Sequence, residues 1–293
     1  MIKSSELILN PDGSVYHLNL KPEYIANDII FVGDPERVSK ITQHFETIEF
    51  SKQKREFKTE TGIYKGKRLT VQSTGIGPDN IDIVMNELDA LVNIDLNTKV
   101  LKPNHTTLNI VRIGTSGSLQ ADIPVDSWVM SKFAIGLDNM LRSYLIEEHT
   151  DSELEDAFIL HTNWDIRKGR PTVVSCNETL EIKFCSEKFH KGFTGTVGGF
   201  YGPQGRIVRL NIQDPELNHK MDTFNYKGTS ITNLEMETAA IYGLGKLLGH
   251  NCLSLNAIIA NRAVGEFSSN PEKTVNELIA YTLDKLVEIN YTD

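Results

Sequence analysis

The stretch that decides the fold class covers residues Asp28–Arg37 and reads DIIFVGDPER. Its first five residues form an apolar run of the length and composition that are typical of a buried strand. A glycine turn follows, and Asp34 and Pro35 then stand where a helix N-cap and a first helical residue are expected. The stretch therefore predicts a strand, a tight turn and a helix in direct succession.

The same order recurs along the chain. Strands are predicted over residues 69–73, 108–113, 127–133, 172–176, 230–234 and 253–260, and helices over 36–41, 81–92, 235–248 and 271–290. Three strands end in small, glycine-bearing turns, and such carboxyl-end loops are where open α/β sheets bind ligands. Without a linker-like segment, the chain is expected to form one α/β domain over residues 1–293. Two polar stretches, near 93–107 and 142–169, are expected to be peripheral insertions.

Composition excludes several classes of protein. The net charge of −9 argues against a general nucleic-acid binder, which normally carries a basic surface. No apolar stretch approaches the roughly 20 residues of a membrane span, and no signal segment opens the chain. Three irregularly spaced cysteines favour a reducing compartment, so a cytoplasmic location is expected. The eight histidines form no zinc-binding motif, and no zinc site is expected.

Two segments could hold an anion. Gly33 precedes a predicted helix, whose amino end favours negative charge, and Arg37 lies one turn into that helix. Residues Arg112–Gly117 read RIGTSG, which places an arginine inside an apolar strand. Burial of that guanidinium requires an anion or a carboxylate partner. Arginine, hydroxyls and free amides together suit a tetrahedral oxyanion, although a structural ion pair is the alternative.

Two later segments could hold a planar base and a sugar. Residues Gly198–Arg206 read GGFYGPQGR and combine an aromatic ring, an amide and a guanidinium, which matches the edge and face of a uracil. A polar surface loop is the alternative for this segment. Residues Asn233–Ala240 read NLEMETAA and place two carboxylates at a strand-to-helix junction. These carboxylates could accept hydrogen bonds from sugar hydroxyls or simply complement the helix dipole.

In this combination the chain resembles the nucleoside phosphorylase-I family, and within it the uridine-cleaving branch. The resemblance runs from about Tyr16 to Arg262. Its markers occur in the family's order: GDP at 33–35 with Arg37, REF at 55–57, STGIG at 73–77, the Arg112–Gly117 run, QGR at 204–206 and EME at 235–237. The resemblance implies a three-layer α/β/α fold around a central mixed, partly barrel-like sheet.

The resemblance also implies roles for single residues. Phosphate would be bound by Gly33, Arg37, Arg112 and Thr115, with Arg55 reaching the phosphate of a neighbouring subunit. Ribose would be bound by Met236, Glu237 and Glu235, and His17 would close a partner's ribose site. The base would be bound by Phe200, Gln204 and Arg206. Catalysis would depend on Arg112, Arg206 and Glu237. Sites completed by a partner imply a homo-oligomer that is dimer-based, with the choice between dimer and hexamer open.

The expected reaction is phosphorolysis of uridine to uracil and ribose 1-phosphate, a step of pyrimidine salvage or nucleoside catabolism. Inorganic phosphate would be the co-substrate, and no cofactor is expected. Purine-cleaving relatives usually carry an aspartate after the late strand, whereas residues 257–262 here read AIIANR. A purine or deoxy-pyrimidine nucleoside phosphorylase, a phosphate-independent nucleosidase and a catalytically silent nucleoside-binding protein are the alternatives.

One marker departs from the family pattern. The family's usual TGIGGP run is one glycine shorter here, at Thr74–Pro78. Some relatives bind a monovalent cation between subunits through a glutamate that matches Glu56 and a hydroxyl near this run. The shortened run puts a potassium ion near Glu56 in doubt.

Overall fold

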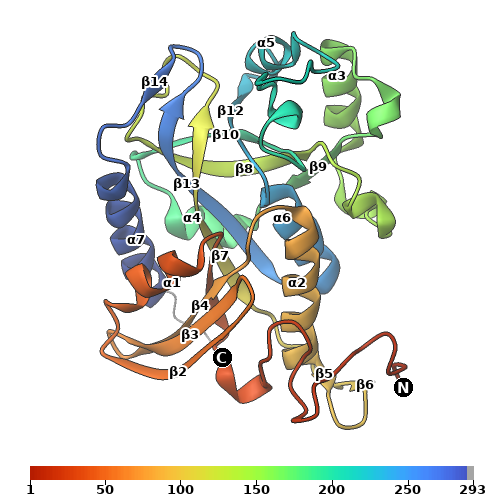
Figure 1. The fold of residues 1–293 in the computed structure, drawn as a ribbon, viewed down its shortest axis with the longest axis vertical. Coiled ribbons are helices and arrows are strands. Elements are labelled where there is room, and N and C mark those ends of the chain that lie inside the picture. Colours follow the sequence, from red (N-terminus) through yellow and green to blue (C-terminus); the bar gives the residue numbers. More distant parts are fainter. Residues whose placement is uncertain (289–293) are drawn as a thin grey trace.

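The structure is a computed structural model that describes residues 1–288. Figure 1 shows a large twisted sheet with helices on its faces. The strands of this sheet are β1 (Asp28–Val32), β2 (Thr47–Lys54), β3 (Phe57–Tyr64), β4 (Lys67–Ser73), β7 (Asn109–Ser118), β8 (Trp128–Gly136), β9 (Thr172–Ser175), β10 (Phe189–Thr196), β11 (Asn225–Tyr226), β12 (Thr229–Glu235), β13 (Asn251–Asn261) and β14 (Glu266–Phe267). The α-helices are α1 (Pro35–Thr42), α2 (Pro78–Asn93), α3 (Ser152–Thr162), α4 (Glu178–Phe184), α5 (Leu217–Asp222), α6 (Thr238–Leu248) and α7 (Pro271–Val287).

Five strands close into a barrel. β7 pairs in parallel with β13 and antiparallel with β12, while β8 joins β13 to β10, and β10 joins β12. Strands β1, β4, β3 and β2 continue from β7 as an open sheet. Helix α6 packs on β8 and β13, α7 packs on β13, and α1 packs on β3 and β4. The predicted fold class, with its mixed and partly barrel-like sheet, is confirmed.

The opening stretch folds as its sequence predicts. All five residues of β1 are buried, which explains the uninterrupted apolar run. The carboxylate of Asp34 accepts the backbone N–H of Glu36 at 2.8 Å, and Pro35 is the first residue of α1. The turn therefore leaves Gly33 and the amino end of α1 at the carboxyl end of the sheet.

Two element boundaries differ from the prediction. β7 continues to Ser118 instead of opening into a loop at Gly114, because its far end pairs with both β13 and β12. Helix α6 begins at Thr238 rather than at Glu235. Glu235 is the last residue of β12, and its carboxylate accepts the N–H groups of Glu237 and Thr238, both at 2.9 Å. A side chain from the strand thus caps the helix that follows.

The two polar stretches differ in how they pack. Residues 93–107 carry a separate hairpin made of β5 (Ile94–Asp95) and β6 (Val100–Leu101). Residues 142–169 contain α3, whose Leu154 and Phe158 are buried in an apolar cluster with Leu217 and Phe224. The predicted end of α7 at residue 290 lies outside the described residues. Over residues 1–288, none of the helices combines the length and the hydropathy that a membrane crossing requires.

Packing at the barrel seam yields a stability prediction. A Cβ atom at Gly192 in β10 would lie 2.7 Å from the carbonyl oxygen of Ser230 and 2.6 Å from the side chain of Thr232. We expect Gly192→Ala to lower the free energy of unfolding by about 1–3 kcal/mol, because the backbone of β12 must shift. Gly198→Ala is the control, since its Cβ would only touch Asp138 at 3.5 Å. Equal urea-unfolding free energies for the two variants would contradict this account of the seam.

Candidate active site

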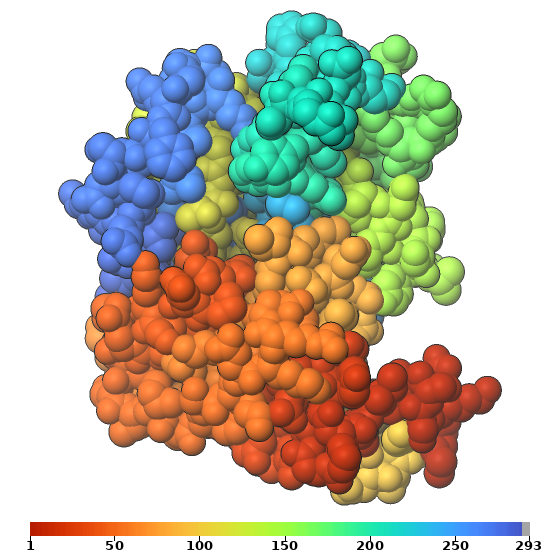
Figure 2. All heavy atoms as spheres, viewed as in Figure 1, coloured from red at the N-terminus to blue at the C-terminus, as the bar shows by residue number. Residues whose placement is uncertain are grey.

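A cavity of about 670 Å³ opens at the carboxyl ends of the central strands. Figure 2 shows a hollow on this face, bordered by blue, cyan and orange segments, with yellow strand residues at its base. The turn after β1, the end of β7, the loop near residue 200, the β12–α6 junction and the end of β13 all contribute to its lining. Segments more than 200 residues apart in the sequence therefore meet in one place.

The cavity collects most of the residues that the sequence singled out. Its lining includes Gly33, Arg37, Arg112, Thr115, Phe200, Gln204, Arg206, Glu235, Met236 and Glu237. Glu56 also lines it. His17 and Arg55 do not line the cavity of their own chain.

Two cations face each other at one end of this cavity. Arg112 is almost completely buried, and the Arg37 guanidinium donates to the carbonyl of Ile113 at 3.3 Å. Burial lowers the pKa of Arg37, and the positive charge of Arg112 lowers it further. The two guanidinium groups repel each other and are largely shielded from water. A bound anion would offset that repulsion and stabilise both charges.

Carboxylates hold the deeper arginine in place. Arg112 Nη2 donates to Glu237 Oε2 at 2.5 Å and lies 3.3 Å from Glu235 Oε2, while Nη1 donates to Asn256 Oδ1 at 3.0 Å. Burial alone would lower the pKa of Arg112, but the carboxylates of Glu237 and Glu235 raise it overall. The structural ion pair that the sequence left open is thus present, and Arg112 stays charged beside the cavity.

The two carboxylates have different surroundings. Both oxygens of Glu235 accept hydrogen bonds from the amino end of α6, and Oε1 also accepts one from Thr196 at 2.6 Å. Glu237 Oε1 accepts the N–H of Gly77 at 2.9 Å, and Oε2 accepts from Arg112. Burial raises the pKa of Glu237, against the effect of the Arg112 charge. Glu235 therefore caps α6, and Glu237 connects Arg112 to the Gly77 backbone, while their contacts with ribose stay predictions.

The other end of the cavity is rich in hydrogen-bond donors. Gln204 is buried, and its Oε1 accepts from Arg206 Nη1 at 2.5 Å and also from Arg262 Nη2. Two guanidinium groups thus fix the amide orientation and leave Nε2 as the donor of Gln204. The Arg206 guanidinium lies 3.9 Å from the centre of the half-exposed Phe200 ring. This end offers an aromatic face and an edge of N–H donors.

Arg262 and Asn256 are site residues that sequence reasoning missed. Arg262 lines the cavity, and burial together with the charge of Arg206 lowers its pKa to about 10. The signal was an arginine directly after an apolar strand, at the end of β13. Asn256 carries a polar side chain in the middle of that strand, where full burial requires a partner such as Arg112.

His17 and Arg55 lie elsewhere on the chain. His17 Nδ1 is 2.7 Å from Glu87 Oε1, which anchors the amino-terminal segment on α2. Arg55 occupies the turn between β2 and β3 with a φ of 56°. Their predicted contacts with a bound nucleoside and phosphate would require another subunit, and those contacts stay predictions.

Two places could be considered for a metal ion. Glu56 lines the cavity and packs against Gly75, where a Cβ atom would meet the glutamate Cγ at 2.8 Å. At the amino ends of β7 and β13, Asp89, His105 and His250 bring one ligand atom each within 4.8 Å of the others. His250 Nδ1 accepts the N–H of Leu108 at 3.2 Å, so a neutral ring carries its proton on Nε2, which faces Asp89 at 3.4 Å. That nitrogen makes no hydrogen bond within the described residues, and it would have to lose its proton before it could bind a metal ion.

The described geometry is that of a cavity that combines buried arginines, carboxylates and the donor-rich loop around Gln204. Residues 28–288 match the family model of the phosphorylase superfamily. The chain therefore belongs to the phosphorylase superfamily, as the resemblance in its sequence indicated. Members of this nucleoside phosphorylase family are pentosyltransferases that use phosphate as co-substrate and need no cofactor.

The similar proteins include both a uridine phosphorylase and a purine nucleoside phosphorylase. The chain is 28% identical to a uridine phosphorylase from Thermococcus kodakarensis over 92% of its length and 86% of the relative. It is also 28% identical to a DeoD-type purine nucleoside phosphorylase from Bacillus thuringiensis, over 93% of this chain and 98% of that one. A Trypanosoma brucei nucleoside phosphorylase with uridine phosphorylase activity superposes with a TM-score of 0.87 at 29% identity, covering 97% and 100% of the two chains.

The facing arginines yield a binding prediction. Arg37→Gln should raise the Kd for inorganic phosphate by about 10- to 100-fold, because a hydrogen bond to a charged group contributes about 1.5–3 kcal/mol. Isothermal titration of phosphate into the free protein measures this change. Arg167→Gln is the control, since that side chain is 82% exposed and does not line the cavity. An unchanged Kd for Arg37→Gln would remove Arg37 from the anion site.

Proposed function

We propose that this protein catalyses the phosphorolysis of uridine to uracil and ribose 1-phosphate. The observation that carries the proposal is the single cavity that Arg37 and Arg112 line together with Gln204, Arg206 and Arg262. Glu237 lines the same cavity and accepts a hydrogen bond from Arg112. These groups can serve phosphate, the base and the ribose, respectively.

The proposed mechanism needs positioning and charge stabilisation rather than a covalent nucleophile. Phosphate is held by the two arginines, by the N–H of Gly33 and by the hydroxyl of Thr115. Glu237 and Met236 hold the ribose. The bond between C1′ and the base nitrogen breaks, and its electron pair moves onto the base. A phosphate oxygen then bonds to C1′, which develops positive charge in the transition state.

The donor-rich end supports a pyrimidine over a 6-aminopurine. Charge that develops on the leaving uracil spreads to its carbonyl oxygens, where Arg206 and Arg262 donate hydrogen bonds. The exocyclic amino group of a 6-aminopurine is itself a hydrogen-bond donor. It would face the guanidinium donors without an acceptor between them. At the end of β13 the cavity is lined by Ile259, Ala260 and Arg262, with no acid that could protonate a purine. Because one relative is a purine nucleoside phosphorylase, a 6-oxopurine nucleoside is the competing substrate for this chain.

A substrate comparison tests the proposal. Uridine, thymidine and inosine are assayed side by side, with and without phosphate, at equal concentrations. We expect uridine to be cleaved, and only when phosphate is present. Preference for inosine would favour a purine enzyme, and cleavage in phosphate-free buffer would favour a nucleosidase. Stabilisation by uridine without any product would indicate a binding protein, and each of these three results contradicts the proposal.

A mutation tests the base-binding end. Arg206→Ala should lower kcat/KM for uridine by about 100-fold or more, as does the loss of one donor to developing negative charge. Arg112→Ala should cause a loss of similar size at the phosphate end. Arg167→Ala, an exposed arginine outside the cavity, should match the parent enzyme. Activities of Arg206→Ala and Arg112→Ala within a few fold of the parent would rule out their proposed roles.

We also propose that His17 and Arg55 complete the cavity of a partner subunit in a homo-oligomer. Arg55→Ala and Arg206→Ala protomers, each impaired alone, would form mixed dimers with one intact site. Random reassortment should restore about a quarter of the parent activity, because half of the dimers are mixed and each holds one intact site of two. Mixtures no more active than the separate variants would contradict a shared site.

Three free cysteines support a cytoplasmic location for such an enzyme.

A further inference from the structure

A second cavity lies on the other side of the loop that holds Gln204. Its volume is about 760 Å³, and it is bounded by Leu137 after β8, Val197 after β10, the loop of residues 201–214, and the segment after α3 that carries Trp164 and Lys168. Of the residues that line the two cavities, Arg206 alone is common to both. The second cavity is therefore not an extension of the base-binding end, and the proposed reaction leaves it unused.

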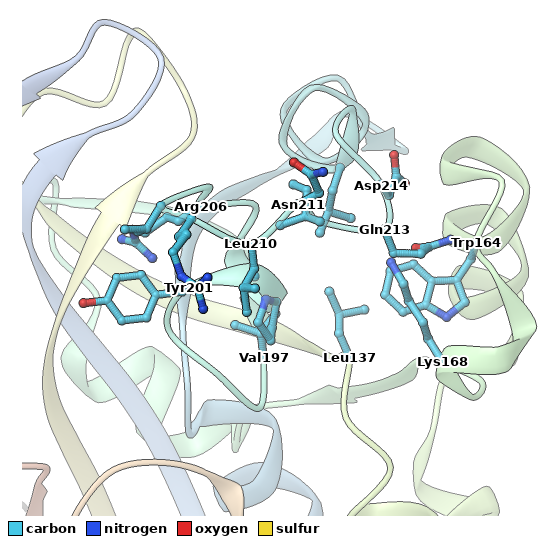
Figure 3. A pocket seen from close by; sticks show the side chains of 16 residues that line it. Leu137, Trp164, Lys168, Val197, Tyr201, Arg206, Leu210, Asn211, Gln213 and Asp214 are labelled. Atoms are coloured by element: carbon cyan, nitrogen blue, oxygen red, sulfur yellow. The ribbon is translucent and has the colours of Figure 1, made fainter.

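The walls of this cavity are mostly apolar. Leu137, Val197 and Leu210 lie in its middle, between Tyr201 and Arg206 on one side and Trp164 and Lys168 on the other, as Figure 3 shows. The Trp164 indole donates its N–H to the carbonyl of Gly169 at 2.7 Å, so the ring offers only its apolar surface to a ligand. A volume of this size accommodates a small aromatic molecule.

At the Trp164 end of the second cavity, one positive charge has no paired carboxylate in the described chain. Lys168 Nζ lies 4.9 Å from the centre of the Trp164 ring, and no carboxylate of residues 1–288 comes within salt-bridge distance of Lys168. The neighbouring acids are compensated, since Asp165 pairs with Arg167 at 2.6 Å and Asp214 pairs with Lys220 at 2.8 Å. The cavity is thus locally cationic on a chain whose net charge is −9.

The loop that forms the outer wall exposes apolar side chains. Val208 is 78% exposed and Leu210 is 72% exposed, although both line the cavity. Residues 207–213 have no backbone hydrogen bond to the rest of the described chain, and Gln213 Nε2 tethers them to Asp165 at 2.9 Å. An apolar ligand body would cover side chains that water now contacts, which is favourable.

We propose that this cavity binds an amphipathic aromatic carboxylate. Its ring system would lie against Leu137, Val197 and Leu210, and its carboxylate would pair with Lys168. Charge complementarity selects an anion, and the indole face and aliphatic walls select a flat apolar body. The anionic head belongs at the Trp164 end, because Arg206 also lines the catalytic cavity and its Nη1 already donates to Gln204 and to the carbonyl of Phe200.

Biphenyl-4-carboxylate is the probe, titrated calorimetrically into the full-length protein at low ionic strength. We expect saturable binding with one site per protomer. Biphenyl-4-methanol, which has the same body without the charge, should bind at least about tenfold more weakly, the effect of losing one charge-assisted hydrogen bond. Absence of saturable binding, or equal binding of the alcohol, would overturn the proposal.

Variants locate the bound probe. Lys168→Gln and Leu210→Ala should each weaken binding by about tenfold. Lys183→Gln and Leu145→Ala are the matched controls, because neither residue lines the cavity and Leu145 is 90% exposed. Arg37→Gln should leave probe binding unchanged. Loss of binding in Arg37→Gln but not in Lys168→Gln would place the probe in the catalytic cavity and refute the second site. Because the readout is binding, its outcome is separate from that of the uridine assays.

Discussion

The buried charge of Arg112 is the constraint on which the rest of the site depends. A guanidinium deep in a barrel is costly unless charged and polar partners surround it. Arg112 lies in β7, and two other strands supply partners: β12 ends in Glu235, and β13 carries Asn256. The closure of the barrel between β7 and β12 is what brings the arginine and the carboxylates together. The same contacts therefore stabilise the barrel and position the charged residues of the site.

In this arrangement Arg112 has carboxylate partners and Arg37 has none among the described residues, and this difference can support anion binding and catalysis. Glu237 and Glu235 compensate Arg112 from one side, whereas Arg37 approaches from α1 with its pKa lowered by burial and by Arg112. An oxyanion between the two arginines would relieve that repulsion. At the far end, Arg206 and Arg262 converge on one amide oxygen of Gln204, so the donors are oriented before any base arrives. Four arginines thus line the cavity, and Glu237 is paired with one of them.

Much of the fold and of the site could be predicted from local sequence, and the exceptions have physical causes. β1 and the Asp34 cap follow from short-range patterns. β2 and β3 were not predicted, because β2 is largely exposed and β3 buries the polar residues Thr59, Glu60 and Thr61, so neither strand has an apolar run. The boundaries at Gly114 and Glu235 depend on pairing with distant strands, which no local pattern records. Most markers from Gly33 to Glu237 lie in one cavity, with Arg55 the exception, and Arg262 was missed because its role depends on Gln204, 58 residues earlier.

The central claim is that an oxyanion occupies the space between Arg37 and Arg112, directly beneath a ligand whose ring faces Gln204. A crystal structure of the protein grown with phosphate and uracil tests this claim most directly. The account predicts phosphate within hydrogen-bonding distance of both guanidinium groups and of the Gly33 N–H, with uracil beside Phe200. Phosphate bound elsewhere, with Arg37 turned to solvent and Arg112 engaged only by Glu237 and Glu235, would contradict it.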